Sequence, residues 1–450
     1  MKILIITTYY PPDTSIAAVR PYMLAKYLAQ RGHEITVLRS GEFYDSASDF
    51  FDMNIPVRVI SYLGENSPAE QYARGEWKKV EKVHTESRIS FLPEALRKPI
   101  AKVYHACKRP IEFRRWLNAI QDKFQIQKSA LDAMREESFD IVFATYGQLE
   151  NIYAGQYAAE LFHCKLIQDF RDAVAAKVFR TRREYQILKR IQDEAVQRAD
   201  GVTTVSEGLL RDLSAGGIAS CPNMVLYNGY EPSASKKSGP VEFEKGIFSI
   251  CYTGTLYGEL SDFSPLLQAL KQLSQQNRIC LSNVKLHYAG ADFEPLLEKA
   301  KKQGMEEILV NHGYVSRAEA ERIQNSADLF LVLSWNTKKS QGILTGKFYE
   351  GIRAKRPILT VVSGDVPNSE LNILNQKYHY GFCYEASREA EQFPEFCDFL
   401  SRTYEEKMEF GRVKFDSNTE LASAFRYDRL AVQLEQFCEK IMRTERENTL

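Results

Sequence analysis

A lysine and a glutamate stand three residues apart in GILTGKFYEGIRAKRPIL, residues 342 to 359, which has the pattern of a loop, a helix and the start of a strand. Lys347 falls in the first turn of that predicted helix, where unpaired N–H groups and partial positive charge favour an anion over a cation. Thr345 and Gly346 can cap the helix and leave its first N–H groups available. The placement therefore predicts that an external anion shares this site with Lys347.

Lys347 and Glu350 fall on one face of the predicted helix. A cation beside bare N–H groups suits a diphosphate, and a carboxylate one turn further along suits a diol, which it can hold through two hydroxyl hydrogen bonds. Gly351 allows close approach to the backbone. This combination describes a nucleoside diphosphate, with phosphates at the helix tip and ribose along its flank. The alternative is a surface Lys–Glu ion pair, although lysine first is the weaker orientation.

Motifs for other chemistry are absent from the sequence. No G-x-G-x-x-G follows the first predicted strand, and no P-loop, G-x-S-x-G or D-x-D motif occurs. The eight cysteines are scattered, without C-x-x-C spacing or a Cys/His cluster at zinc spacing. This pattern predicts a reducing compartment, no structural metal and no cofactor.

These residues need a scaffold that brings helix tips and strand ends together. A buried-strand pattern at 2–8, an amphipathic helix at 17–31 and a strand at 34–38 predict a β-α-β unit with both sheet faces covered. Further strands are expected at 141–145, 165–169 and 202–205. After a turn-rich stretch the pattern restarts, with strands at 248–252, 285–289, 308–312, 329–333 and 358–362 and with helices from Pro265, Phe293 and Arg317.

The predicted fold class is therefore α/β, with two Rossmann-like, doubly wound domains that face each other across a cleft. Open α/β sheets bind ligands at the carboxyl ends of their strands, so the chemistry is expected there. The predicted limits are 1–232 for the first domain, with an insertion at about 41–135, then 233–246 for a linker and 247–415 for the second domain. A final helix at about 420–443 can pack back on the first domain.

Composition narrows the class of protein. The 450 residues, 44% hydrophobic and 26% charged, are typical of a globular protein of two or three domains. Lys+Arg (59) balances Asp+Glu (59), which indicates neither nucleic acid nor an acidic partner. The N-terminal apolar stretch is too short for a secretory signal, and no window approaches the ~18 apolar residues of a spanning helix. A cytoplasmic protein is expected.

Positive charge is locally concentrated at 97–116, RKPIAKVYHACKRPIEFRRW, where Glu112 is the only acid and aromatic residues interleave. Such a stretch can lie on an anionic membrane surface, which would place the protein peripherally on the inner face of the cell membrane. A solvated helix pair with a few packed aromatics is an equal alternative. Pro99 and Pro110 argue against one continuous amphipathic helix here.

Nine short stretches in this order resemble the family 4 glycosyltransferases. Besides 342–359 and the closing helix, they are YYPPDTSIAAVRPYMLAKYLAQRGHEITVL, IQDFRDAV, RADGVTTVSEGLLRDL, LYNGYEP, YTGTLYGEL, HYAGAD and VNHGYVSRAEAERIQNSADLFLVLS. That family has the two-domain GT-B fold and retains the anomeric configuration, and this chain is similar to its subgroup with an SKxYE-like donor segment. The resemblance covers nearly the whole chain except the insertion.

The resemblance implies a role for each matching donor-side position. Glu350 matches the second glutamate of the family's E-x7-E pattern and would hold the donor ribose, and Lys347 matches the SKxYE lysine and would face the donor phosphates. The other implied donor-binding residues are the diphosphate turn Gly254 and Thr255, the base-recognising loop Gly313, Tyr314 and Val315, and Leu344, Thr345 and Gly346 before the lysine.

On the acceptor side, the resemblance matches Arg20 and the loop 13–17 to the wall that faces the sugar and phosphates, and Arg171 and Asp172 to an Arg-Asp pair at the cleft. Lys347, Asp172 and Arg20 are thus the expected catalytic residues. Asp172 as a simple helix cap is an equal alternative. Trp335 is interpreted as lining the acceptor side or as packing.

The chain departs from the family pattern at three places. The first glutamate of E-x7-E falls on Gly342, so its contact with the sugar is missing or made by backbone. No Arg-x5-Lys phosphate clamp follows Gly254. The common first-domain histidine is replaced near Tyr146 and Gly147.

The prediction is a retaining, metal-independent glycosyltransferase that moves a sugar from a UDP- or GDP-linked donor to a glycan or lipid-linked acceptor in polysaccharide biosynthesis. One rival is a nucleotide-sugar 2-epimerase of the same fold, although the first domain offers no convincing set of acids and bases. Another is a degenerate member that binds nucleotide without turnover, which the missing glutamate at Gly342 motivates.

Overall fold

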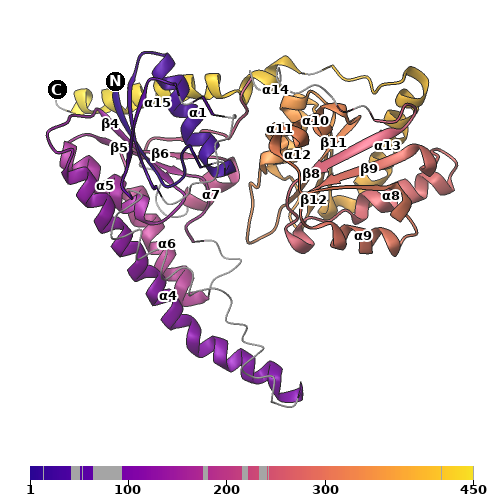
Figure 1. Ribbon diagram of the computed structural model, residues 1–450, viewed down its shortest axis with the longest axis horizontal. Helices are drawn as coiled ribbons and strands as arrows, with labels where there is room; N and C mark the ends of the chain where they lie inside the picture. The colour runs from indigo at the N-terminus through magenta and orange to yellow at the C-terminus, as the bar shows by residue number, and fades with distance from the viewer. Residues whose placement is uncertain are drawn as a thin grey trace.

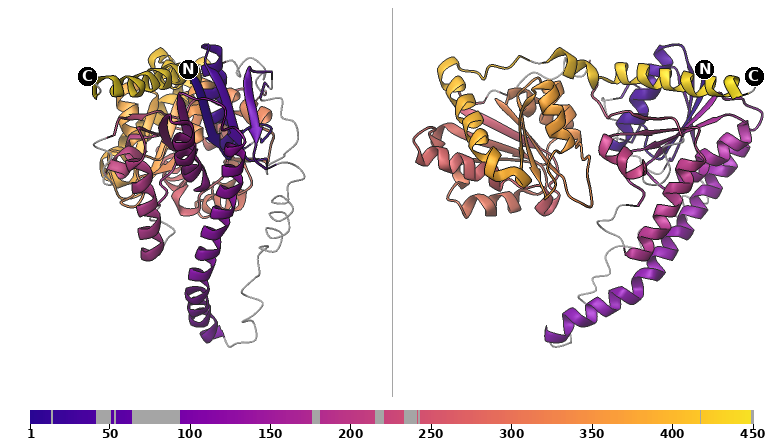
Figure 2. Two further views of the ribbon diagram at one scale, coloured as in Figure 1. Left: turned by 90° about the vertical axis from the view of Figure 1, so that its left-hand side faces the viewer. Right: turned by 180° about the vertical axis from the view of Figure 1, so that it is seen from behind.

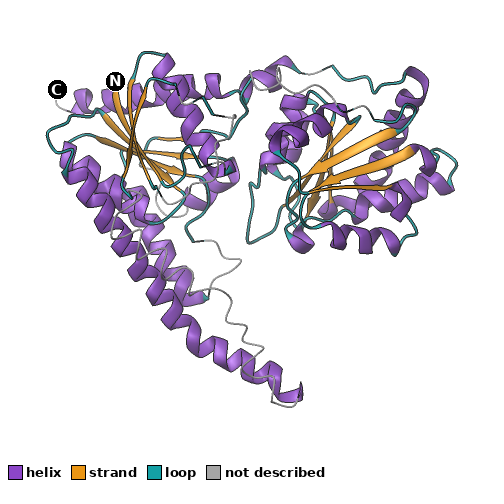
Figure 3. Ribbon diagram, in the orientation of Figure 1, coloured by secondary structure: helices purple, strands orange, loops and turns teal. Residues whose placement is uncertain are grey.

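The computed structural model describes residues 1–13, 15–41, 51–52, 54–63, 94–175, 181–214, 221–232, 241, 243–416 and 418–448, and the side chains of these except 94–109 and 444–448. Two twisted parallel sheets stand side by side, each with helices on both faces (Figures 1 and 3). This is the two-domain GT-B architecture that the sequence predicted.

The first half contains a seven-stranded sheet in the order β3-β2-β1-β4-β5-β6-β7, with every pairing parallel. Its strands are β1 (Lys2–Thr7), β2 (Glu34–Arg39), β3 (Val57–Ser61), β4 (Ile141–Tyr146), β5 (Lys165–Phe170), β6 (Gly201–Thr204) and β7 (Asn223–Val225). The connecting helices are α1 (Ile16–Gln30), α4 (Glu94–Asp132), α5 (Glu150–Phe162), α6 (Arg182–Gln197) and α7 (Glu207–Ser214).

The second half contains a six-stranded parallel sheet in the order β10-β9-β8-β11-β12-β13. Its strands are β8 (Phe248–Thr253), β9 (Val284–Ala289), β10 (Leu309–Gly313), β11 (Leu329–Trp335), β12 (Ile358–Ser363) and β13 (Gly381–Glu385). Its helices are α8 (Ser264–Gln275), α9 (Phe293–Lys301), α10 (Arg317–Ser326), α11 (Gly346–Ala354), α12 (Glu370–Tyr378) and α13 (Glu389–Phe410).

Each sheet has strands that the sequence patterns did not reveal, namely β3, β7 and β13. β3 is an edge strand whose side chains are mostly exposed, so it lacks an apolar run, and it lies within the segment predicted as an insertion. β7 is three residues long. The predicted linker falls largely outside the described residues, and the predicted domain limits stay a prediction.

The basic stretch 97–116 belongs to one helix, α4, which runs unbroken from Glu94 to Asp132. The prediction that Pro99 and Pro110 interrupt it was wrong. Further along the same helix, Trp116 and Ile120 pack with the apolar cluster that also contains Leu188 of α6. The helix runs down and away from the sheet of the first half (Figure 1).

The final helical stretch is two helices, α14 (Thr419–Ala424) and α15 (Tyr427–Asn448), rather than the single helix predicted. α15 lies across the first half, although it follows the second half in sequence (Figure 2). Leu434 and Phe437 pack in one cluster with Ile3 and Leu28, and Glu435 bonds Arg31 of the turn after α1 (Oε2 to Nε, 2.7 Å). No helix among the described residues is both long and apolar enough to cross a membrane.

Candidate functional site

A cavity of about 430 Å³ opens at the carboxyl ends of β8, β9 and β10, beside the N-terminus of α11. Parallel strands end at one sheet edge, so short turns after them converge there. Eight predicted donor-side residues line it: Gly254, Thr255, Tyr314, Val315, Thr345, Gly346, Lys347 and Glu350. Gly313 lies directly behind, where its carbonyl accepts the N–H of Gly290 at 2.9 Å.

Helix α11 begins as the sequence predicted. Thr345 has extended backbone at the N-cap position, and its side chain makes no capping hydrogen bond. Its buried Oγ1 has no hydrogen-bond partner. The N–H of Phe348 bonds the carbonyl of Thr345 at 3.0 Å. Since a helix cannot satisfy its own first N–H groups, the tip of α11 offers those of its first two residues to the cavity.

Lys347 and Glu350 form an ion pair inside the cavity. Lys347 Nζ lies 2.8 Å from each carboxylate oxygen of Glu350, and the two side chains are 26% and 19% exposed. Gln324 Nε2 also donates to Glu350 at 2.6 Å. Burial alone would raise the pKa of Glu350, but the charges of Lys347 and of nearby arginines hold it below its usual range. Glu350 is therefore an ionised, largely enclosed acceptor.

Gly254 creates the space that Lys347 occupies. A Cβ at Gly254 would lie 2.6 Å from Lys347 Cε, and the backbone φ of +147° is one that glycine favours. The turn after β8 thus holds the aliphatic part of Lys347 against the cavity wall.

Two arginines of the cavity were not named as site residues from the sequence. Arg317 opens α10 directly after the loop at 313–315, and its side chain is 38% exposed and 3.6 Å from Glu321. Arg353 is buried and donates to Gln324 Oε1 at 2.6 Å. The spacing of Arg353, three residues after Glu350, could have placed it on the same helix face.

Exposed apolar side chains surround the same cavity. Ile16 is 62%, Tyr257 55% and Tyr314 90% exposed, and all three line it. Trp335 packs against Tyr257, with ring centroids 5.4 Å apart. Exposed apolar groups gathered at one place are typical of a binding surface.

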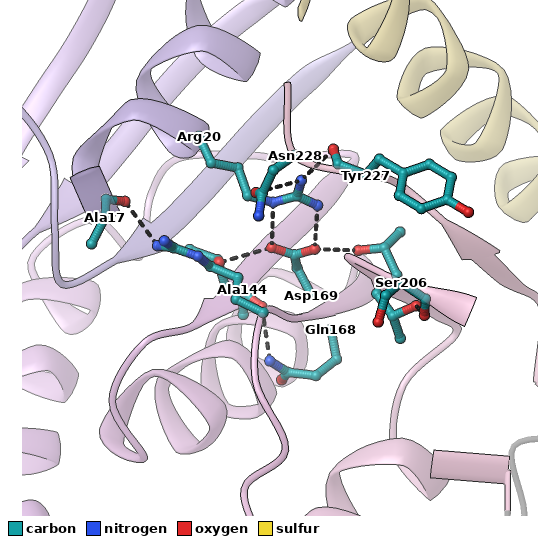
Figure 4. Close-up of polar contacts among 12 residues, drawn as sticks. Ala17, Arg20, Ala144, Gln168, Asp169, Ser206, Tyr227 and Asn228 are labelled. Atoms are coloured by element: carbon teal, nitrogen blue, oxygen red, sulfur yellow. Dashed lines mark hydrogen bonds and ion pairs between the residues drawn. The ribbon is translucent and has the colours of Figure 1, made fainter. Parts of the chain in front are cut away.

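A second cavity, about 170 Å³, adjoins the first and shares Glu350 and Arg317 with it. Arg20 lines it but is only 1% exposed. Its Nε and Nη2 donate to the two oxygens of Asp169 at 3.2 and 2.8 Å, and its Nη1 donates to the carbonyl of Tyr227 at 2.8 Å (Figure 4). The guanidinium is thus held by protein acceptors rather than directed freely into the cleft.

Asp169 at the end of β5 organises this region and was not predicted as a site residue. Thr145 and Thr203, from β4 and β6, also donate to it at 2.8 and 2.7 Å. Burial would raise the pKa of Asp169, but Arg20 and these hydroxyls hold it below its usual range. Arg171, two residues further along the chain, donates to the carbonyl of Ala17 at 2.8 Å.

A third cavity, about 560 Å³, lies between the two halves. Asp172 and Leu344, both predicted site residues, line it from opposite sides and do not line the donor-side cavity. Its cations are Arg171 and Arg211 of the first half and Lys338 and Lys339 of the second, against the acids Asp172 and Asp212.

Comparison with known proteins agrees with this architecture. Residues 17–229 match the model of the glycosyl transferase 4-like domain. No curated protein matches the sequence. Among solved structures, sucrose-phosphate synthase from Thermosynechococcus elongatus is similar with a TM-score of 0.63 and 10% identity, over 98% of this chain and 99% of that one.

Two further solved structures are similar over 98% of this chain. The lipopolysaccharide outer core galactosyltransferase WaaB has a TM-score of 0.56 and 12% identity, with 99% of its chain covered. HepE from Anabaena in complex with UDP has a TM-score of 0.58 and 13% identity, with 100% of its chain covered. At these identities the likeness shows the fold. With the match at 17–229, the first half of the chain resembles the glycosyl transferase 4-like domain, and the whole chain has the GT-B fold of the glycosyltransferases.

Proposed function

We propose that this glycosyltransferase moves a sugar from a nucleotide-sugar donor to a glycan or lipid-linked acceptor, with retention of configuration and without a metal ion. The observation that carries the proposal is one cavity in which Lys347, Glu350 and the free tip of α11 face the turn after β8 and the loop after β10. HepE, a protein of the same fold, has been solved with UDP and with UDP-glucose.

The donor fits the cavity as follows. The diphosphate lies at the tip of α11, where the first N–H groups and Lys347 neutralise its charge. The phosphates attract Lys347 away from Glu350, which can then accept hydrogen bonds from the ribose hydroxyls. Gln324, which donates to Glu350, keeps the carboxylate in its orientation. Tyr314, almost fully exposed at the rim, offers its ring to the base.

Arg317 is proposed as the second cation of the phosphate site. The family's clamp after Gly254 is missing from the sequence, yet Arg317 lines both the donor-side cavity and the adjoining one. A guanidinium there can neutralise part of the phosphate charge, and so replace the cations of the missing clamp.

The proposed reaction needs no enzymic nucleophile. Negative charge grows on the leaving diphosphate as the glycosidic bond breaks, and Lys347, Arg317 and the helix tip stabilise it. The acceptor hydroxyl attacks from the same face, and its proton passes to the departing phosphate oxygen. Arg20 is assigned a positioning role, since its donors are engaged by Asp169 and Tyr227.

The acceptor is placed in the cavity of about 560 Å³ between the halves. Arg171 and Asn228 line both this cavity and the one that contains Arg20, which in turn shares Glu350 and Arg317 with the donor-side cavity, so the small cavity lies next to both spaces. The excess of cations over acids in its lining supports an acceptor that carries negative charge, such as a phosphorylated lipid carrier.

Glu350→Ala tests the donor site. The loss of a charged hydrogen-bond acceptor should weaken UDP or GDP binding by about 1–3 kcal/mol, measured by isothermal titration calorimetry. Glu306→Ala, a change of an exposed glutamate outside the cavity, is the control. Equal affinity of the folded Glu350→Ala variant and the control would refute the placement of the ribose.

Incubation with radiolabelled UDP-sugars and a membrane extract tests turnover. Label that enters the lipid fraction supports the transferase. Label that returns as an interconverted nucleotide sugar, or stays as unchanged bound donor, would refute it.

The helix α4 supports the proposal of membrane contact. Arg114, Arg115 and Ile111 are exposed on it, and the sequence N-terminal to them is strongly basic. A basic helix that extends away from its domain can rest on an anionic surface, close to a lipid-linked acceptor.

A further inference from the structure

The N-terminus of α7, in the first half, is capped by a carboxylate of the second half, that of Glu370. Glu370, the first residue of α12, accepts the backbone N–H of Glu207 at 2.8 Å and that of Gly208 at 3.1 Å. Ser206 Oγ accepts the next N–H, that of Leu209, at 3.1 Å. A helix cannot satisfy its own first N–H groups, so two of those on α7 are paired only while the halves are together.

The same contact has a second anchor on the first half. Tyr227 donates its hydroxyl to Glu370 Oε1 at 3.0 Å, and its carbonyl accepts from Arg20 at 2.8 Å. Glu370 is only 5% exposed. The carboxylate is therefore enclosed between the halves, and its links continue to the Arg20–Asp169 pair (Figure 4).

Two glycines allow the backbones to meet beside Glu370. A Cβ at Gly342 would lie 2.6 Å from Gly208 Cα and 2.7 Å from Ser206 Oγ, and a Cβ at Gly208 would lie 2.4 Å from Gly342 Cα. Real Cβ atoms do not come so close to a backbone atom, so any side chain at either position would push the halves apart. The family glutamate that is missing at Gly342 could not be accommodated here.

We infer that Glu370 is a positioning residue that holds the two halves at a fixed spacing by capping α7 across the cleft, with Gly208 and Gly342 as the contact that sets the distance. Ser206, Gly208 and Gly342 line the cavity of about 560 Å³, so this spacing also shapes the proposed acceptor site. Only the effect of this spacing on the acceptor site, and so on sugar transfer, rests on the proposed function. The spacing itself does not.

Small-angle X-ray scattering of the full chain tests the spacing. Glu370→Ala leaves two N–H groups of α7 unpaired, and Gly342→Ala introduces the clash, so both variants should show a larger radius of gyration than the wild type. Gly411→Ala is the matched control, because Gly411 has the same φ of +70° as Gly342 and nothing lies within 4 Å of its Cβ position. It should scatter like the wild type.

Rescue and ligand binding separate positioning from simple loss of stability. Glu370→Gln keeps one acceptor oxygen and the shape of the side chain, so its radius of gyration should fall between those of the wild type and Glu370→Ala. UDP affinity should be unchanged in Glu370→Ala, since neither Glu370 nor its partners line the donor-side cavity. Transfer from UDP-glucose to a membrane extract should fall in the same variant.

Wild-type scattering from both Glu370→Ala and Gly342→Ala would overturn the inference, and so would equal expansion in Gly411→Ala. If Glu370→Ala does not fold, Glu370→Gln and Gly342→Ala decide by the same measurement. Failure of the wild type to bind UDP would refute the proposed function and leave the scattering result standing.

Discussion

At the residue scale, the pair of Lys347 and Glu350 is neither a surface ion pair nor two independent contacts. Each side chain is largely enclosed, and each is the main partner of the other. The two charges partly neutralise each other inside the cavity, and Gln324 is a further donor to the carboxylate. If the proposed diphosphate attracts Lys347, it releases Glu350 to accept from the ribose, so the two parts of a nucleotide should bind cooperatively.

Gly254→Ala tests how Lys347 is placed. The new methyl group would lie 2.6 Å from Lys347 Cε and displace the ammonium, which should weaken UDP binding about tenfold or more, or ~1.4 kcal/mol. Gly258→Ala is the control, because Gly258 also has positive φ (+58°) but has nothing within 4 Å of its Cβ position. Both variants should lose stability, and calorimetry should show weaker UDP binding only in Gly254→Ala. Equal losses of affinity would argue against this role.

At the element scale, the carboxyl ends of β4, β5 and β6 are tied together by one buried carboxylate. Asp169 accepts from Thr145 on β4, from Thr203 on β6 and from Arg20 on α1. The pair with Arg20 is almost completely buried, with side chains 2% and 0% exposed. Removal of one partner leaves the other charge uncompensated, which is more costly than the loss of an exposed ion pair.

Asp169→Asn should therefore lower the free energy of unfolding by about 3–5 kcal/mol.

The pKa of Asp169 is held below its unfolded value. The contribution of Asp169 to stability is therefore complete above the ordinary carboxyl pKa and is lost as the pH falls through the folded value. Wild-type stability should drop in acid, below about pH 4, more steeply than that of the variant. Denaturant unfolding across pH measures both. Parallel pH profiles would show that Asp169 does not carry this dependence.

At the scale of the whole molecule, α4 extends beyond the rest of the first half and gives the protein a long basic projection (Figures 1 and 2). Each basic residue near an anionic membrane contributes about 1 kcal/mol. The double change Arg114→Glu and Arg115→Glu should lower flotation with phosphatidylcholine vesicles that contain phosphatidylserine by more than about tenfold. The control reverses Lys301 and Lys302, an exposed pair at the end of α9.

Wild-type protein that does not float with anionic vesicles, or that floats equally with pure phosphatidylcholine, would remove the membrane proposal. Equal loss of flotation in the two double variants would show that the bulk charge matters and that α4 has no special role.

The sequence by itself determined the alternation of strands and helices and the fold class. Apolar runs such as 2–7 and 248–253 are buried on both sheet faces and can be recognised without any partner. It also placed the cation, the carboxylate and the helix tip of 342–359 on one face, since i and i+3 are neighbours on any helix. For the same reason, strands without an apolar run, such as β3, were missed.

The tertiary structure alone decided what these residues meet. Arg20, expected to face the sugar, is committed to Asp169, 149 positions away in the sequence. Arg317 and Gln324 reach the site because α10 packs beside α11, and α15 joins the first half after the chain has completed the second. The contacts of Gly342 with Gly208 and of Glu370 with Glu207 exist only where the two halves touch. Local periodicity fixes which way a side chain faces along its own element, but contacts between distant segments depend on how whole sheets and helices pack, which no short stretch encodes.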